Sequence, residues 1–228
     1  MQPIKVVIHG ASGRVGQVLV NAFSNTPEIK LAGAVDIKAP SPALTLPDGS
    51  TIPFSAELEP VLTAAHPDVM VDFSLAPASM PAIRLAARYK VNQVIGTTGF
   101  TPEDVAEIEQ LAGTHQIGII LASNFALGAV LMMYFARLAA RFMDSAEIIE
   151  LHHDRKLDAP SGTSITTARS MAEYRGNPFS PPADEDKNFP SRGSKVEGIP
   201  IHSVRLPGLM AHQEVIFGGL GQTLSIRH

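Results

Sequence analysis

Ile4 to Gly16, with the sequence IKVVIHGASGRVG, decides the fold of this chain. The run from Ile4 to His9 is apolar and rich in β-branched residues, which is typical of a strand buried on both faces of a parallel sheet. Glycines follow at positions 10, 13 and 16, and helical spacing begins at Gln17. This order of strand, glycine turn and helix predicts the opening of a dinucleotide-binding unit.

The choice of dinucleotide depends on the next strand. Ala11 stands where the common glycine fingerprint has its middle glycine, so the turn alone is only moderately specific. Leu31 to Asp36 predicts a second strand that ends in an acid, twenty residues beyond Gly16. Asp36 could accept hydrogen bonds from the ribose hydroxyls of NAD, and Lys38 could pair with the 2′-phosphate of NADP. Both cofactors stay open, as does an ordinary strand-end acid beside a solvated lysine.

Strand-like and helix-like segments go on alternating along the first half of the chain. A cluster of four prolines from Ala39 to Pro53 predicts a loop within this pattern. Repeated βα units predict an α/β fold with a doubly wound, Rossmann-type parallel sheet. The expected strands are Ile4 to His9, Leu31 to Asp36, Asp68 to Phe73, Val91 to Gly96 and Ile117 to Leu121, and the expected helices are Gln17 to Ser24, Ala56 to Ala65, Pro77 to Tyr89 and one from Thr101.

Ligands of such sheets bind beyond the carboxyl ends of the strands. The residues at those ends are small, polar or aromatic, which suits backbone and amide contacts to a nicotinamide, although each end by itself could be a plain turn. We expect NADH or NADPH to contact Gly10, Ala11, Ser12, Gly13, Arg14, Val15, Asp36, Lys38, Phe73, Gly96, Thr97, Thr98, Ala122, Ser123, Asn124 and Phe125.

The βα alternation stops after Phe125, so we place a domain boundary near Asn124. Residues 1–123 are expected to form the dinucleotide-binding domain. Residues 124–228 are expected to form an α+β domain on a mixed or antiparallel sheet. Its expected elements are a helix from Leu127 to Phe142, a strand from Ala146 to Leu151, a helix from Ser164 to Tyr174, a polar stretch from Glu173 to Gly198, and strands at Ile201 to Arg205, Gln213 to Phe217 and Gln222 to Arg227.

Residues 150–163, ELHHDRKLDAPSGT, carry the most polar chemistry of the chain and are expected in a strand-to-helix loop. His152 and Lys156 are four residues apart, which places them on one face of either a strand or a helix. Ser161-Gly162-Thr163 would open the next helix, where free N–H groups attract anions. A proton donor, a cation and a helix start that binds anions, here called the anion seat, suit a carboxylate substrate. A solvated turn with an ordinary helix cap is the alternative.

Composition limits the possible classes of function. A net charge of −4 without a long basic run argues against a nucleic-acid partner. The absence of cysteine removes disulfides, thiolate nucleophiles and cysteine-ligated zinc, and we expect no metal. The apolar region from Ile117 to Met133 contains Gly118 and Gly128, so it predicts no membrane span. No export signal precedes the first strand, so we expect a cytoplasmic protein.

Together these segments resemble the 4-hydroxy-tetrahydrodipicolinate reductases, also called dihydrodipicolinate reductases, of bacterial lysine and diaminopimelate biosynthesis. The resemblance covers essentially the whole chain, and HHDRKLDAPSGT is its most specific motif. The motifs are GASGRVG at 10–16, GTTG at 96–99, ASNF at 122–125, HHDRKLDAPSGT at 152–163, HSVRLPG at 202–208 and AHQEVIFGG at 211–219.

This resemblance implies reduction of a cyclic dicarboxylate imine to tetrahydrodipicolinate with NADH or NADPH. It makes His152 and Lys156 the proton-donating pair, and His153, Gly162 and Thr163 contacts of the substrate carboxylates. Ser161 belongs to the same turn, and we include it among the substrate contacts. The resemblance also implies a homotetramer formed through the sheets of the second domain.

Family members usually continue past His228 with a strand, a loop and a helix that pack on the cofactor domain. We therefore expect closure between the domains to be altered here, whether the ending is natural or shortened. Two other functions stay open. A related amino-acid dehydrogenase would act on an amino acid in the oxidative direction. A dinucleotide-sensing module without catalysis would have no need of His152, His153 and Lys156.

Overall fold

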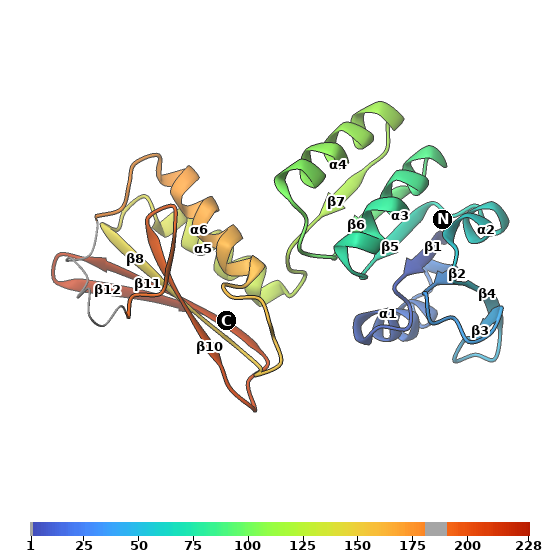
Figure 1. Cartoon of the computed structure of the whole chain (residues 1–228), viewed down its shortest axis with the longest axis horizontal. Coiled ribbons are helices and arrows are strands. Elements are labelled where there is room, and N and C mark those ends of the chain that lie inside the picture. Colours follow the sequence, from blue (N-terminus) through green and yellow to red (C-terminus); the bar gives the residue numbers. More distant parts are fainter. Residues whose placement is uncertain (1, 181–190) are drawn as a thin grey trace. The chain divides into compact units, whose positions relative to one another are not determined.

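The structure is a computed structural model that describes residues 2–180 and 191–228. Its chain divides into two compact units, Met1–Ala122 and Ser123–His228. The first unit runs from blue to green in Figure 1, and the second from green to red. In the described part of the chain, no helix is long and apolar enough to cross a membrane.

The first unit is built on a seven-stranded sheet with the order β3-β4-β2-β1-β5-β6-β7. Every pairing is parallel except that of β3 with β4. The predicted doubly wound α/β fold is confirmed. The strands are β1 (Ile4–His9), β2 (Ile29–Val35), β3 (Ala43–Thr45), β4 (Thr51–Ser55), β5 (Val69–Asp72), β6 (Asn92–Ile95) and β7 (Ile119–Leu121), and the helices are α1 (Arg14–Ser24), α2 (Leu58–Ala65), α3 (Ala76–Arg88) and α4 (Pro102–His115).

Helices cover both faces of this sheet because successive residues of its central strand point to opposite sides. Val6 and Ile8 of β1 pack toward α1, whereas Val7 packs toward α2 and α3. All three side chains are buried. α4 packs on α3 and covers the β6 end of the same face. The continuous apolar run that predicted β1 therefore has a core on each side to fill.

The glycine turn after β1 depends on two missing side chains. Gly10 has φ +85°, and a Cβ atom there would lie 2.5 Å from the Phe73 carbonyl oxygen. A Cβ atom on Gly16 would lie 2.1 Å from the Gly10 carbonyl oxygen. These glycines allow α1 to start directly against the end of β1.

The loop predicted from Ala39 to Pro53 is wrong, because this region contains the antiparallel pair β3 and β4. β4 alternates exposed and buried residues, and it buries Ile52 and Phe54. β4 lies between β3 and β2, but its register with β2 begins only at Phe54, so Pro53 stands where that pairing has not started. The prolines concealed this alternation.

The second unit is built on a five-stranded mixed sheet with the order β12-β11-β8-β10-β9. β10 is parallel to the central strand β8, and the other pairings are antiparallel. A mixed or antiparallel sheet was predicted, and the mixed form is the one found. Its elements are α5 (Leu127–Ala139), β8 (Ser145–His152), α6 (Gly162–Arg175), β9 (Ser194–Val196), β10 (Ile199–Arg205), β11 (Ala211–Gly219) and β12 (Gln222–Arg227).

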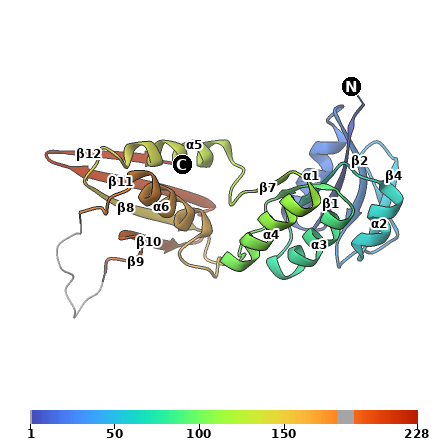
Figure 2. The same cartoon turned by 90° about the horizontal axis from the view of Figure 1, so that it is seen from above.

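Both helices of the second unit lie against one face of its sheet (Figure 2). Ala136 of α5 and Met171 of α6 pack onto Ile148 of β8 and Phe217 of β11, and all four are fully buried. β9 was not predicted, because it lies in the stretch from Glu173 to Gly198 that was expected to be irregular. Positions 181–190 of that stretch lie outside the described residues.

Candidate active site and cofactor pocket

The carboxyl ends of β1, β2 and β5 border a pocket of about 280 Å³ in the first unit. The predicted cofactor residues that line it are Gly10, Ser12, Gly13, Asp36, Lys38 and Phe73.

Asp36 connects the glycine turn to the end of β2. One carboxylate oxygen accepts a hydrogen bond from the Ser12 N–H at 2.9 Å, and the other accepts one from the Lys38 N–H at 2.9 Å. The carboxylate is therefore held at the edge of the pocket, where the sequence predicted a contact to ribose hydroxyls. Lys38 is exposed beside it.

The other predicted cofactor residues are more widely distributed. Ala11 is buried within the turn, and Arg14 and Val15 are exposed on the first turn of α1. The Thr97 hydroxyl accepts a hydrogen bond from the Ser74 N–H at 2.8 Å, so Thr97 lies beside the end of β5. Gly96 and Thr98 flank Thr97 directly after β6, Ala122 ends the first unit, and Ser123, Asn124 and Phe125 begin the second.

Sequence reasoning missed a buried network beneath the pocket. Asp72, the last residue of β5, is fully buried and accepts hydrogen bonds from Ser79 and, at 3.1 Å, from Thr97. His9 Nδ1 lies 2.8 Å from the same carboxylate. Burial raises the pKa of Asp72, but the hydrogen bonds from His9 and Ser79 outweigh it and leave this pKa below its usual value. The network joins the ends of β1, β5 and β6. An acid at the end of an apolar strand was its only sequence signal.

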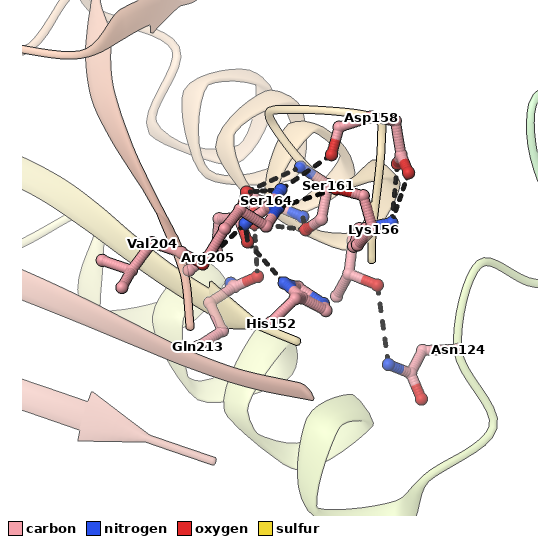
Figure 3. Close-up of polar contacts among 11 residues, drawn as sticks. Asn124, His152, Lys156, Asp158, Ser161, Ser164, Val204, Arg205 and Gln213 are labelled. Carbon is pink, nitrogen blue, oxygen red and sulfur yellow. Dashed lines mark hydrogen bonds and ion pairs between the residues drawn. The ribbon is translucent and has the colours of Figure 1, made fainter. Parts of the chain in front are cut away.

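The second unit has its own pocket, of about 130 Å³, where α5, α6, β8 and β11 meet. Three of the predicted substrate-side residues, His152, Ser161 and Thr163, line it together. Asn124 also lines it, and its amide lies 3.5 Å from the Thr163 hydroxyl (Figure 3). Asn124, predicted as a cofactor contact, thus has its side chain toward the second-unit pocket.

His152 is the last residue of β8. The sequence had instead predicted that the strand ends at Leu151 and that His152 lies in the following loop. Its Nδ1 is hydrogen-bonded to the carboxylate of Glu150, which leaves Nε2 as the ring nitrogen without that partner. Burial lowers the pKa of His152, and the nearby charges of Lys156 and Arg205 lower it further. The hydrogen bond and charge of Glu150 oppose this effect but do not cancel it.

Glu150, on β8, is fully buried. Arg205 donates to both of its oxygens at 2.8 Å, and the Ser161 N–H donates to one of them at 3.2 Å. Burial raises the pKa of Glu150, but the hydrogen bonds from Arg205 and His152 outweigh it and leave this pKa below its usual value. The carboxylate therefore stays ionised in the interior because the charged guanidinium of Arg205 and further N–H donors surround it.

Lys156 lies in the loop after β8 with its Nζ 2.7 Å from both carboxylate oxygens of Asp158. The Lys156 side chain is 21% exposed and that of Asp158 is 63% exposed. Burial raises the pKa of Asp158, but the hydrogen bond and charge of Lys156 lower it by more. The ammonium that was predicted to hold a substrate anion thus has an acidic partner from its own loop.

The start of α6 holds the remaining predicted residues. The Ser161 hydroxyl caps the helix by accepting a hydrogen bond from the Ser164 N–H at 3.2 Å, and it is buried. Gly162 and Thr163 form the first turn of the helix. His153 is half-buried, and its Nδ1 has no partner among the described residues. The ring therefore has one nitrogen that no described residue pairs with.

Comparisons with known proteins show the family of the chain. The family model described as dihydrodipicolinate reductase, N-terminus, matches residues 4–125, and the model of the C-terminus matches residues 128–228. The chain belongs to the dihydrodipicolinate reductase family. A 4-hydroxy-tetrahydrodipicolinate reductase of Dehalococcoides mccartyi strain CBDB1 is 60% identical over 100% of this chain and 87% of that protein. That of Geobacillus thermodenitrificans is 48% identical over 99% of this chain and 86% of that protein.

Solved structures extend the comparison. The dipicolinate-bound dihydrodipicolinate reductase from Paenisporosarcina sp. TG-14 is 41% identical, with a TM-score of 0.80, over 100% of this chain and 88% of that one. GenD2 from gentamicin A biosynthesis, solved with NAD, has a TM-score of 0.68 at 14% identity and covers 100% of this chain and 73% of that one. This second likeness shows a shared fold alone.

Glu150 and Arg205 are the residues of this dihydrodipicolinate reductase site to which sequence reasoning assigned no role. Glu150 lies two residues before His152, so both side chains point to the same side of β8. Arg205 ends β10 and is paired in register with His152. The first relation was visible in the sequence, but the second requires the pairing of β8 with β10.

Proposed function

We propose that the protein reduces 4-hydroxy-tetrahydrodipicolinate to tetrahydrodipicolinate, the step of lysine and diaminopimelate biosynthesis that gives its relatives their name. The 4-hydroxyl group leaves as water with a hydrogen of the adjacent carbon, and the double bond so formed is reduced by addition of a hydride to C4 and of a proton to that carbon. The observation that carries the proposal is the second-unit pocket, in which His152 lies beside the start of α6.

The first unit fits a dinucleotide, and NADH or NADPH supplies the hydride when bound. Gly10 and Gly13 leave the turn without side chains where a pyrophosphate would approach the backbone. The Asp36 carboxylate suits free ribose hydroxyls, and Lys38 beside it tolerates a phosphate. We propose that both cofactors are used, with a modest preference for NADH.

His152 is proposed as the acid that protonates the ring carbon. Because Nδ1 is hydrogen-bonded to Glu150, Nε2 is the nitrogen that can deliver a proton. We assign one substrate carboxylate to Lys156 and the other to the N–H groups at Gly162 and Thr163, with His153 as a further donor. The Paenisporosarcina reductase was solved with bound dipicolinate, a planar dicarboxylate, which supports this class of ligand.

The test is a coupled assay that follows NADH and NADPH oxidation with freshly generated substrate. We expect oxidation that depends on the substrate and is lost in His152→Ala. No oxidation with either cofactor, together with NAD reduction by an amino acid, would instead support the amino-acid dehydrogenase. Binding of NADH without any turnover would support a sensing module.

We also propose a homotetramer in the cytoplasm. α5 and α6 cover one face of the second sheet, and on this unit the opposite face carries partly exposed side chains from every long strand. Packing against further copies would remove that face from solvent. In the first unit, helices on both faces of the sheet already do this. Sedimentation equilibrium should return four times the chain mass of 24.3 kDa, and a monomer would contradict the assembly.

A further inference from the structure

The proposed reaction assigns no role to one buried acid of the second unit. Glu150 is fully buried, and its carboxylate is hydrogen-bonded to the His152 ring, the guanidinium of Arg205 and the Ser161 N–H. A buried charge is retained at a cost in desolvation, which a hydrophobic residue of similar volume would avoid. Its partners therefore indicate what it does.

We propose that Glu150 is a positioning residue that fixes the ring of His152 with Nε2 presented for proton transfer. This inference rests on the proposed function of His152. Glu150 does not touch the substrate in this scheme, and acts through the imidazole alone.

The identity of the donating nitrogen follows from hydrogen-bond chemistry. An ionised carboxylate can only accept, so the hydrogen between Glu150 and His152 belongs to Nδ1. In the neutral ring Nε2 then carries the lone pair, and in the protonated ring it carries the transferable proton. Rotation of the ring by half a turn would break this bond, so the buried carboxylate selects one orientation.

The charges around the ring set how readily that proton leaves. Glu150 favours the protonated imidazole, whereas burial, Lys156 and Arg205 disfavour it. Asp158 pairs with Lys156 and reduces the effect of the ammonium. Arg205 neutralises part of the Glu150 charge, so the carboxylate orients the ring without holding its proton strongly. An acid that releases its proton near neutral pH is the more effective catalyst.

Arg205 also holds the loop that carries Lys156. The Arg205 guanidinium donates to the Asp158 carbonyl at 2.7 Å and to the Lys156 carbonyl at 3.3 Å, and Glu150 accepts from the Ser161 N–H. The loop that carries Lys156 is thus tied in its middle to Arg205 (Figure 3) and at its end, through Ser161, to the carboxylate that orients His152. A glutamine at position 150 would keep an oxygen for the Ser161 N–H, so these contacts do not depend on the Glu150 charge.

The test compares Glu150→Gln with His152→Ala and with the double variant. Glutamine keeps the shape and removes the charge. We expect kcat of Glu150→Gln to fall about tenfold to a hundredfold, with KM within about threefold, because the acid is misplaced while the carboxylate donors remain. The alkaline limb of the pH profile should move to lower pH. The double variant should be no slower than His152→Ala, because both changes remove the same function.

Glu107→Gln is the matched control. Glu107 also makes a two-oxygen pair with an arginine, Arg84, but on the exposed surface of the first unit. We expect it to leave kcat, KM and the pH profile unchanged. Wild-type kcat and pH dependence in Glu150→Gln, or losses that multiply in the double variant, would overturn the inference.

A measurement on the unmodified protein keeps the inference testable if Glu150→Gln does not fold. Nitrogen NMR of selectively labelled histidine, assigned with His152→Ala, should show the neutral His152 ring protonated at Nδ1. Protonation at Nε2 would overturn the inference. Because this measurement requires no turnover, it separates the inference from the proposed reaction, which fails only if the wild-type protein does not reduce the substrate.

Discussion

Replacing Asp158 with asparagine should tighten the binding of dicarboxylates. In the structure the Lys156 ammonium lies 2.7 Å from both oxygens of the Asp158 carboxylate. A substrate carboxylate that uses Lys156 must therefore displace this partner. Asparagine keeps the size of the side chain and removes the competing charge.

The size of the gain follows from the exposure of the pair. The Asp158 side chain is 63% exposed, so water screens its attraction to Lys156. Ion pairs of this kind contribute about 0 to 1 kcal/mol. Since about 1.4 kcal/mol corresponds to a tenfold change in affinity, the dissociation constant should fall by up to about fivefold. The burial that raises the pKa of Asp158 is outweighed by Lys156, so the competing carboxylate is ionised at neutral pH.

Isothermal titration calorimetry with pyridine-2,6-dicarboxylate measures this change. Asp154→Asn is the control, because Asp154 lies in the same loop, is exposed and has no ion pair with any described residue. It should improve binding by less than the Asp158 variant, and raising the salt concentration should reduce the difference. Equal gains in both variants would show a general charge effect. Weaker binding in Asp158→Asn would show that Asp158 orients Lys156 and does not compete for it.

Three further predictions concern catalysis, cofactor choice and the glycine turn. His152→Ala should lower kcat by about a hundredfold to ten-thousandfold with little change in KM. In the wild type, kcat should fall as pH rises through the pKa of His152, because the fraction of protonated His152 falls. Burial lowers this pKa from its ordinary value. Steady-state kinetics over a pH series checks both predictions. Asp36→Asn should shift the ratio of kcat/KM values toward NADPH by about tenfold, because the charge that repels a 2′-phosphate is removed, and equal losses with both cofactors would contradict its role. Gly16→Ala should lower the free energy of unfolding by about 1 to 3 kcal/mol in urea titrations, since its Cβ would meet the Gly10 carbonyl oxygen, whereas Gly113→Ala in α4, with open space around it, should not.

The fold of the first unit could be read largely from local patterns. β1 begins and ends where the apolar run predicted, and the Thr101 cap begins α4 as expected. The main error, at β3 and β4, arose because four prolines and a glycine indicated a loop more strongly than the short alternation of Thr51 to Ser55 indicated a strand. Whether a proline can remain in a strand depends on its neighbours, and the sequence does not specify them.

Sequence alone determined which residues are candidates for the chemistry, because strand and helix periodicity, glycine turns and the grouping of His152, Lys156 and Ser161 are properties of neighbouring residues. Tertiary structure decided how those residues are held. Arg205 reaches Glu150 across 55 residues of chain only because β10 pairs with β8 in a register that aligns Arg205 with His152. His9 meets Asp72 for the same reason, across β1 and β5. The register of distant strands depends on the packing of a whole sheet, so spacing along the chain could not reveal either partner.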